Sequence, residues 1–211
     1  MLYDGRSQKV AQVEWIVMST KEAKRYDRGL WFLEMTGLRK LRQQLLTQID
    51  GNVLEIGMGT GVNLPYYNGA TFVAGIDLRP EVLAGAFTRE NTPPFGVSCA
   101  NAHHLPFGNG RFDNIVSTLV FCSIPDPPTA LAEIKRVLKP NGRFYLLEHV
   151  RGQNPISQRF TDWLHPAWFA LQEECHLNRE TAVTIQQAGF TIEESSTHGF
   201  GVLQMMTAKK E

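Results

Sequence analysis

The chain is most constrained by short apolar runs that alternate with helical segments after Gly51. These runs occupy residues 52–57, 71–77, 96–100, 113–119 and 142–148. Because each run is apolar almost throughout, we predict strands that are buried on both faces. Segments 80–89 and 128–138 have the pattern of helices, and the second ends before the turn residues 139–142. Strands separated by helices predict an α/β fold with a doubly wound, mostly parallel sheet.

The two ends of the chain complete this plan. Before residue 51 the sequence has the pattern of helices, with apolar faces at Val10, Val13 and Val17 and at Leu38, Leu41, Leu45 and Ile49. After a helix over 179–188, the runs 190–195 and 201–208 are close enough for an antiparallel hairpin at one sheet edge. We therefore predict a seven-stranded sheet in a single domain over 1–211, with N-terminal helices at 1–50 and a lid-like insert at 151–177.

Charge and composition exclude several functions. The 21 Lys and Arg balance the 21 Asp and Glu, so no net field draws the protein to nucleic acid. No stretch has the roughly 20 apolar residues that cross a bilayer, and the first residues lack the pattern of a secretory signal, so we expect a cytoplasmic protein. Cys99, Cys122 and Cys175 are too scattered for a disulfide framework. We also expect no metal site, because no cluster of His, Cys or carboxylates has ligand spacing.

The segment VLEIGMGTG, residues 53–61, follows the first predicted strand. Glycines at 57, 59 and 61 permit the sharp turn and close approach that an adenosine-type ligand needs. Asp77 ends the next strand about 20 residues later, where its carboxylate can accept both hydroxyls of a ribose. A nicotinamide dinucleotide site is the alternative, but it requires Gly-x-Gly-x-x-Gly. Glu55 would also repel a pyrophosphate, whereas it would attract a sulfonium or amino group.

From residue 24 to 208 the chain resembles the class I S-adenosylmethionine-dependent methyltransferases of the small-molecule type. Residues 55–61 are similar to the family's first motif, and Asp77 is similar to its ribose-binding acid. ANAHHLPF at 100–107 is similar to a family segment along the adenine, written Asp-Ala-x-x-Leu-Pro-Phe. Asn101 replaces that Asp and keeps an acceptor oxygen without the charge. Residues 112–126 and 131–150 match the fourth strand with its exit loop and the helix and strand that follow.

The resemblance implies S-adenosylmethionine as cofactor and methyl transfer to a small acceptor as activity. Tyr26 and Asp27 resemble a family pair that folds over the methionine end of the cofactor, although Tyr26 also fits an ordinary tyrosine on a helix surface. The implied cofactor contacts are Tyr26, Glu55, Gly57, Gly59, Gly61, Asp77, Leu78, Asn101, Ala102, His103 and Leu119.

Residues toward the acceptor are expected at the ends of the central strands. Methyl transfer from an activated donor needs alignment of the acceptor more than acid-base machinery. Open parallel sheets bind ligands at the carboxyl ends of their strands, which makes Cys122, after the fourth strand, and His149, at the end of the fifth, candidates. We predict His149 as a general base, and the alternative is an ordinary hydrogen-bonded histidine.

The insert at 151–177 is rich in aromatic residues. Apolar residues recur at helix spacing at Ile156, Phe160, Trp163 and Leu164, and Trp168 and Phe169 follow a break at Pro166. Two interpretations stay open here. The segment is either an amphipathic helix packed on the core, or an apolar lid in which Phe160, Trp163 and Trp168 form a wall over a hydrophobic acceptor.

The identity of the acceptor also stays open. Residues 165–180 resemble a subgroup that methylates alkyl thiols and often carries an N-terminal membrane anchor, whereas residues 64–67 resemble bacterial phospholipid N-methyltransferases. We favour a thiol over a phospholipid amine or a quinone. A nicotinamide-dependent oxidoreductase and a binding module without catalysis are the competing functions. The mildly amphipathic segment 8–18 leaves peripheral membrane contact open, and the sequence does not define the oligomeric state.

Overall fold

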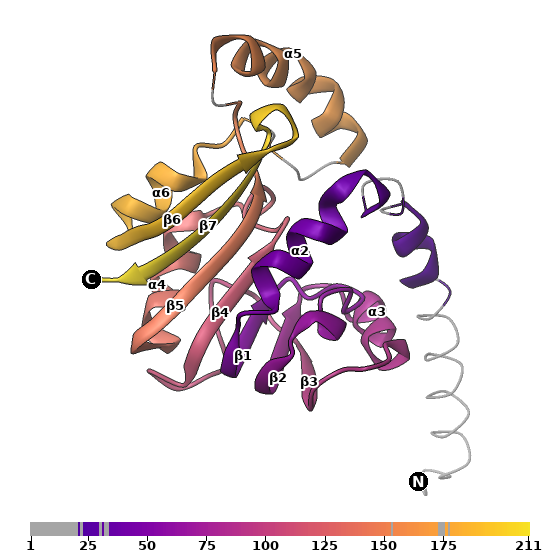
Figure 1. Cartoon of the computed structure of the whole chain (residues 1–211), viewed down its shortest axis with the longest axis vertical. Coiled ribbons are helices and arrows are strands. Elements are labelled where there is room, and N and C mark those ends of the chain that lie inside the picture. Colours follow the sequence, from indigo (N-terminus) through magenta and orange to yellow (C-terminus); the bar gives the residue numbers. More distant parts are fainter. Residues whose placement is uncertain are drawn as a thin grey trace, which may run out of the picture.

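A single seven-stranded sheet forms the centre of the computed structural model, which describes residues 21, 23–29, 31, 34–152, 154–172, 176 and 178–211 (Figure 1). Its strand order is β3-β2-β1-β4-β5-β7-β6. The first five strands pair in parallel, and β7 lies antiparallel between β5 and β6. The strands are β1 (Asp50–Ile56), β2 (Gly69–Asp77), β3 (Phe95–Cys99), β4 (Phe112–Thr118), β5 (Leu138–His149), β6 (Phe190–His198) and β7 (Leu203–Lys210). The predicted sheet and its C-terminal hairpin are thus confirmed.

Helices connect and cover these strands. The described helical elements are η1 (Glu34–Leu38), α2 (Arg39–Leu46), η2 (Leu64–Tyr66), α3 (Pro80–Leu83), η3 (Ala84–Thr88), α4 (Pro127–Val137), α5 (Pro155–Gln172), α6 (Thr181–Gln187) and η4 (Gly199–Gly201). None of the helices within these ranges has the length and apolar character needed to traverse a lipid bilayer.

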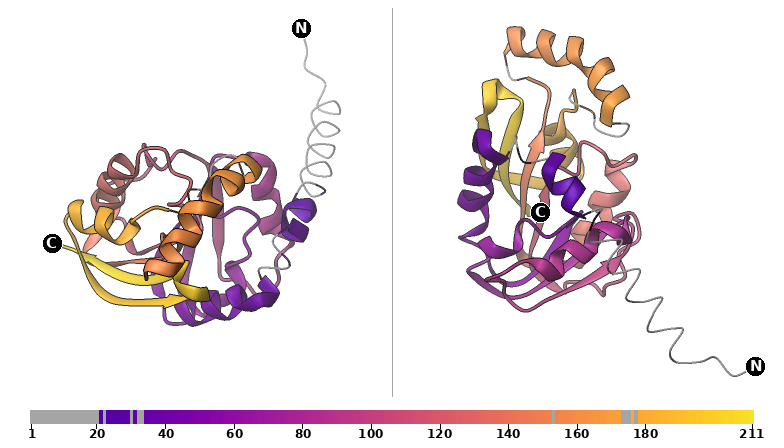
Figure 2. Two further views of the ribbon diagram at one scale, coloured as in Figure 1. Left: turned by 90° about the horizontal axis from the view of Figure 1, so that it is seen from above. Right: turned by 90° about the vertical axis from the view of Figure 1, so that its right-hand side faces the viewer.

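The sheet is buried on both faces because its central strands alternate between two cores. On one face, Leu54 and Ile115 pack with Ile134 of α4. On the other, Val53 and Val116 belong to the core that contains the buried α2 residues Leu45 and Leu46. Figure 2 shows α2 and α4 on opposite sides of the sheet. The sequence predicted an apolar helix face at residues 38, 41, 45 and 49. Of these, Leu38, Leu45 and Ile49 are buried and Leu41 is partly buried. The predicted face at Val10, Val13 and Val17 lies outside the described residues.

Several boundaries differ from the sequence prediction. The strand β3 is not buried on both faces, because it lies at the sheet edge. The predicted turn at 139–142 belongs to β5, which pairs with β4 through a register irregularity there. Segment 80–89 is a short α-helix followed by a 3₁₀ turn. Pro166 lies inside α5 and does not end it, since a proline removes only one backbone donor and tends to kink a helix.

The topology fixes where a ligand can bind. Strand order reverses beside β1, with β2 on one side and β4 on the other. At such a switch point the connections leave the carboxyl ends of the strands in opposite directions, which opens a crevice. The glycine-rich segment after β1 lies at this point.

Candidate cofactor and acceptor sites

The three motif glycines have different neighbours although all have positive φ angles, of 63° at Gly57, 56° at Gly59 and 71° at Gly61. A Cβ atom at Gly57 would lie 2.4 Å from a methyl carbon of Val120, and one at Gly61 would lie 2.9 Å from the Cα of Ala86. At Gly59 the nearest atom would be Cε1 of Tyr26, at 3.8 Å. The first and third glycines therefore permit packing, whereas a Cβ atom at the middle glycine would make only an ordinary van der Waals contact with Tyr26.

The carboxylate of Asp77 ties the end of β2 to this loop. Its Oδ2 accepts a hydrogen bond from Gly59 N at 2.9 Å, and its Oδ1 accepts one from Arg79 N at 3.0 Å. Each carboxylate oxygen has two lone pairs, so each keeps an acceptor position besides these bonds. The side chain is 12% exposed. This arrangement fits a ribose with two adjacent hydroxyls.

The segment that contains Tyr26 and Asp27 docks on the glycine loop. Asp27 accepts hydrogen bonds from Thr60 Oγ1 at 2.5 Å and from Arg89 Nη2 at 2.6 Å. The guanidinium of Arg79 lies over the Tyr26 ring, 5.1 Å from its centroid. Tyr26 thus lies beside Gly59 rather than on a remote helix surface.

Glu55 belongs to a buried polar network below the loop. Its side chain is 1% exposed, and its two oxygens accept hydrogen bonds from Asn63 Nδ2 and Tyr67 OH, both at 2.8 Å. Burial raises the pKa of Glu55 to about 7, although the two hydrogen bonds and the charge of Arg42 oppose the shift. The residue is therefore a carboxyl group whose charge is sensitive to any cation that binds nearby.

Arg42 supplies the positive charge of this network from α2. It is 3% exposed, and its Nη1 donates to Asn63 Oδ1 at 3.0 Å and to Thr118 Oγ1 at 2.7 Å. Its Nε donates to Glu34 at 2.9 Å. The sequence analysis missed the residues of this network other than Glu55, because the contacts join segments that are far apart in the chain.

The remaining predicted cofactor residues gather at neighbouring strand ends. Leu78 directly follows β2 and is 63% exposed. Asn101, Ala102 and His103 follow β3, and Asn101 Oδ1 accepts a hydrogen bond from His103 N at 2.9 Å. The Nε2 atom of His103 is buried and has no hydrogen-bond partner among the described residues. Together with the glycine loop after β1, these residues line the ends of three adjacent strands.

Leu119 extends this row to β4 in a strained conformation. Its φ angle is 60°, which is uncommon for a residue with a side chain. Glu148 holds the adjoining segment: its Oε1 accepts from Ser117 Oγ at 2.6 Å and its Oε2 accepts from Val120 N at 2.9 Å. Burial raises the pKa of Glu148. Strain persists where the surroundings impose it, most often at functional sites.

His149 ends β5 and lines a pocket of about 450 Å³. Across the sheet His149 pairs with Leu203, which in turn pairs with His198. The imidazole Nε2 of His198 lies 3.0 Å from Ser196 Oγ. The residues that line the pocket are Thr36, Gly37, Leu38, Lys40, Leu41, His149, His198, Gly199, Phe200 and Leu203. The sequence predicted His149 at the end of this strand but did not reveal His198. His198 reaches the same pocket only because the β6–β7 hairpin folds back beside β5.

The other predicted acceptor residues do not line this pocket. Cys122 is 1% exposed, beneath the surface after β4. Phe160 and Trp163 are 52% and 76% exposed on α5, while Ser157 and Thr161 of the same helix are buried. The interpretation of Trp163 as a core residue is therefore wrong, since the apolar side of the helix faces outward, and the lid stays a prediction. Trp168 lies in α5, and its side chain is outside the described residues.

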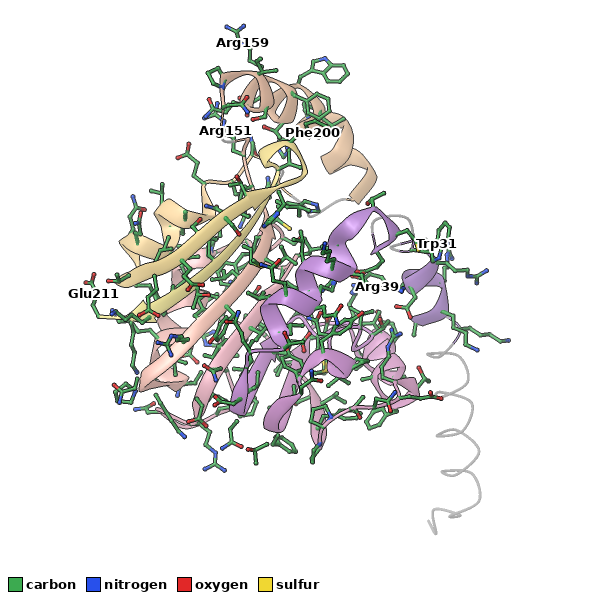
Figure 3. The ribbon with its side chains drawn as sticks, in the orientation of Figure 1. Trp31, Arg39, Arg151, Arg159, Phe200 and Glu211 are labelled. Atoms are coloured by element: carbon green, nitrogen blue, oxygen red, sulfur yellow. The ribbon has the colours of Figure 1, made fainter. Side chains whose placement is uncertain are left out.

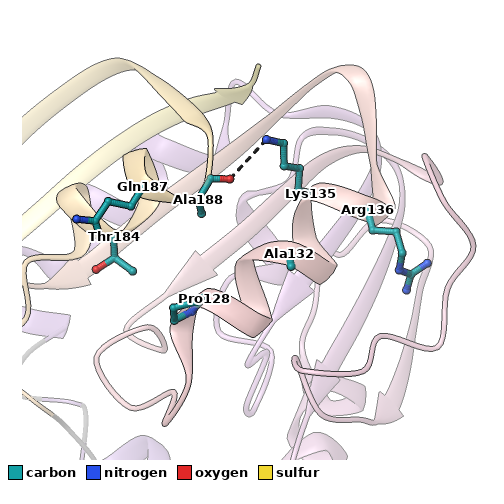
Figure 4. Close-up of a pocket in the computed structure, with 7 residues that line it drawn as sticks. All are labelled: Pro128, Ala132, Lys135, Arg136, Thr184, Gln187 and Ala188. Atoms are coloured by element: carbon teal, nitrogen blue, oxygen red, sulfur yellow. Dashed lines mark hydrogen bonds between the residues drawn. The ribbon is translucent and has the colours of Figure 1, made fainter.

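A second pocket of about 460 Å³ lies between α4 and α6 (Figure 4). Lys135 bridges the two helices by donating to the backbone oxygens of Ala188 and Gly189. None of the predicted site residues lines it. The candidate cofactor residues instead lie at the carboxyl ends of β1 to β4. Within the described residues, no three His, Cys, Asp or Glu side chains are placed to hold a metal ion together.

Comparison with known proteins identifies the family. A model described as a methyltransferase domain matches residues 54–146. Human thiol S-methyltransferase TMT1B is 31% identical over 174 residues, which cover 72% of this chain and 67% of that protein. The chain belongs to the class I S-adenosylmethionine-dependent methyltransferases. S-Adenosylmethionine is the cofactor of this family, so the predicted family and cofactor are confirmed.

Two further relatives and a solved structure extend the comparison. Human thiol S-methyltransferase TMT1A is 33% identical over 146 residues, 66% of this methyltransferase and 60% of that protein. Phosphatidylethanolamine N-methyltransferase of Cereibacter sphaeroides is 32% identical over 114 residues, 51% and 55% of the two chains. A methyltransferase solved in complex with the Haloferax volcanii activator Trm112 shares the fold, with a TM-score of 0.68, 17% identity and coverage of 93% and 97%. The chain thus spans about 60% of the length of human TMT1A.

Proposed function

We propose that this chain transfers a methyl group from S-adenosylmethionine to a small lipophilic acceptor, and that a thiol is the preferred accepting group. One observation supports the proposal: Gly59 and Asp77 are joined by a hydrogen bond at the carboxyl ends of β1 and β2, and a largely apolar pocket lies at the end of β5. A methyltransferase needs two such sites, one for the donor and one for the acceptor.

The residues in the crevice fit the cofactor by their chemistry. Asp77 would hold the ribose hydroxyls, and the absence of a side chain at Gly59 leaves room for the nucleoside. The unpartnered Nε2 of His103 suits a polar atom of the adenine. Glu55 and its network would face the positively charged methionine end, since opposite charges attract. S-Adenosylmethionine supplies an activated methyl group when bound, so the protein's task is to align the acceptor and exclude water.

The pocket at the end of β5 would hold the acceptor. Leu38, Leu41 and Leu203 give it apolar walls, and His149 gives it a group that can take a proton. In the proposed reaction the thiol S–H bond loses its proton to His149. Bound S-adenosylmethionine would supply the methyl group to the thiol sulfur, so that the products would be a methyl thioether and S-adenosylhomocysteine. Two relatives with thiol S-methyltransferase names support the thiol.

A phospholipid amine is the second candidate acceptor, since one relative is named a phosphatidylethanolamine N-methyltransferase. The test incubates the purified chain with S-adenosylmethionine and, separately, alkyl thiols, phosphatidylethanolamine, a hydroquinone or reduced nicotinamide dinucleotide. S-Adenosylhomocysteine is then quantified. We expect turnover with alkyl thiols, lost in His149→Gln and retained in His104→Gln, which changes an exposed histidine. Turnover of the lipid alone would move the assignment to the amine, and cofactor binding without any turnover would identify a binding module.

A further inference from the structure

The helix α5 has an inverted amphipathic pattern. Ile156, Phe160 and Trp163 recur at helix spacing and are 83%, 52% and 76% exposed. The opposite side of the helix buries the hydroxyl residues Ser157 and Thr161. Helices of soluble domains normally turn the apolar stripe toward the core. This stripe is instead directed outward, which is typical of a contact surface.

The tip of the β6–β7 hairpin adds a fourth exposed apolar side chain at the same end of the molecule. Phe200 is 96% exposed and has a φ angle of 59°, between two glycines that also have positive φ angles. Figures 1 and 2 show the hairpin tip at the same end of the molecule as α5, and Figure 3 labels Phe200, Arg151 and Arg159 at this end. A strained backbone that presents a fully exposed phenylalanine indicates a role outside the core. We call Ile156, Phe160, Trp163 and Phe200 the apical surface.

Charged side chains around the apical surface include three basic and two acidic ones, and two of the basic ones have no ion-pair partner among the described residues. Asp162 forms an ion pair with Arg151 at 2.7 Å, and Glu180 lies 3.5 Å from the same guanidinium. Arg159 on α5 and Lys40 in the adjoining pocket form no ion pair with any described residue. Arginine and lysine beside exposed aromatic residues match the headgroup region of an anionic membrane.

We propose that the apical surface docks the protein on an anionic lipid bilayer. The four side chains would enter the headgroup and acyl boundary, while Arg159 and Lys40 would contact lipid phosphates. A second copy of the chain is a poorer occupant, because a stable protein interface takes about 20–30 residues a side. Phe200 lines the pocket that contains His149, so docking would open this pocket toward the lipid. If the proposed function holds, a lipophilic acceptor could then enter from the membrane.

Vesicle flotation tests docking independently of catalysis, without cofactor or acceptor. The full chain is mixed with phosphatidylcholine vesicles that contain or lack phosphatidylglycerol. The test variant carries Ile156→Ser, Phe160→Ser and Trp163→Ser together, and the control carries Phe87→Ser, which changes a 68% exposed phenylalanine of η3. We expect the anionic vesicles to bind the wild type and the control. The triple variant should bind at least about tenfold more weakly, because the free energy of burying even one large apolar side chain corresponds to about a tenfold change in affinity.

Three results would overturn the proposal. In the first, the wild type fails to bind anionic vesicles. In the second, the triple variant binds them as well as the wild type does, which would place the membrane contact elsewhere in the chain. Lipid-free sedimentation could also show a wild-type dimer that the triple variant dissociates, so that a second copy covers the surface. A spectroscopic readout separates these cases: tryptophan emission should shift to shorter wavelength on anionic vesicles, and Trp163→Phe should remove most of that shift.

Discussion

Replacement of Glu55 by glutamine should change how stability depends on pH. Burial raises the pKa of Glu55 from its ordinary value of 4.5 to about 7 in the folded chain. The folded state therefore holds this proton more tightly than the unfolded state. The resulting contribution to stability is fully present below pH 4.5 and is lost as the pH rises through 7. From pH 5 to pH 8 the loss amounts to roughly 2 to 3 kcal/mol.

Urea unfolding at pH 5, 6, 7 and 8 measures this effect as the difference between wild type and Glu55→Gln. Glutamine does not titrate, so the variant should gain roughly 2 to 3 kcal/mol relative to wild type over this range. Glu148, whose pKa is also raised by burial, is present in both proteins and cancels. Glu193→Gln is the control, because its hydrogen bond and ion pair with Arg143 lower the pKa of Glu193 below 4.5. This carboxylate is therefore ionised in both states from pH 5 to pH 8, and the control should run parallel to wild type. Parallel stability curves for wild type and Glu55→Gln would refute the assignment.

Four further substitutions separate binding, packing and catalysis. Gly59→Ala should abolish cofactor binding in a folded protein, whereas Gly57→Ala should mainly destabilise the fold, because its Cβ atom would collide with Val120. Equal melting temperatures and equal cofactor affinities for the two variants would contradict this distinction. Trp163→Ala should leave the melting temperature within about 2 °C of wild type because the side chain is exposed, and a large drop would restore the core interpretation. His149→Gln should lower kcat for an alkyl thiol at least about 100-fold with unchanged cofactor affinity in calorimetry; an unaltered kcat would exclude His149 as the base.

Local sequence patterns predicted the parts of the site that depend on neighbouring residues. The glycine loop and Asp77 could be predicted because a strand, a turn and the next strand end lie within one short segment. The sheet could be predicted because buried parallel strands are apolar almost throughout. The exposed edge strand β3 was predicted less well, since an apolar run does not reveal whether it lies at an edge.

The parts that were missed depend on distant contacts. Arg42 reaches Thr118, 76 positions along the chain, and nothing around either residue marks the pair. His198 joins the pocket of His149 only through the register of β7. The helical spacing of Phe160 and Trp163 was correct, but periodicity alone does not decide whether an apolar stripe faces the core or the outside.

Calorimetric titration of S-adenosylhomocysteine tests the central claim most directly. The account predicts that the wild type binds this product with a micromolar Kd in the strand-end crevice. Asp77→Ala removes the proposed ribose acceptor and the hydrogen bond to Gly59 N, and should weaken binding by about 1.5 to 3 kcal/mol, roughly tenfold to 150-fold. A folded wild-type sample that binds no S-adenosylhomocysteine, or an Asp77→Ala variant that binds it equally well, would contradict the account.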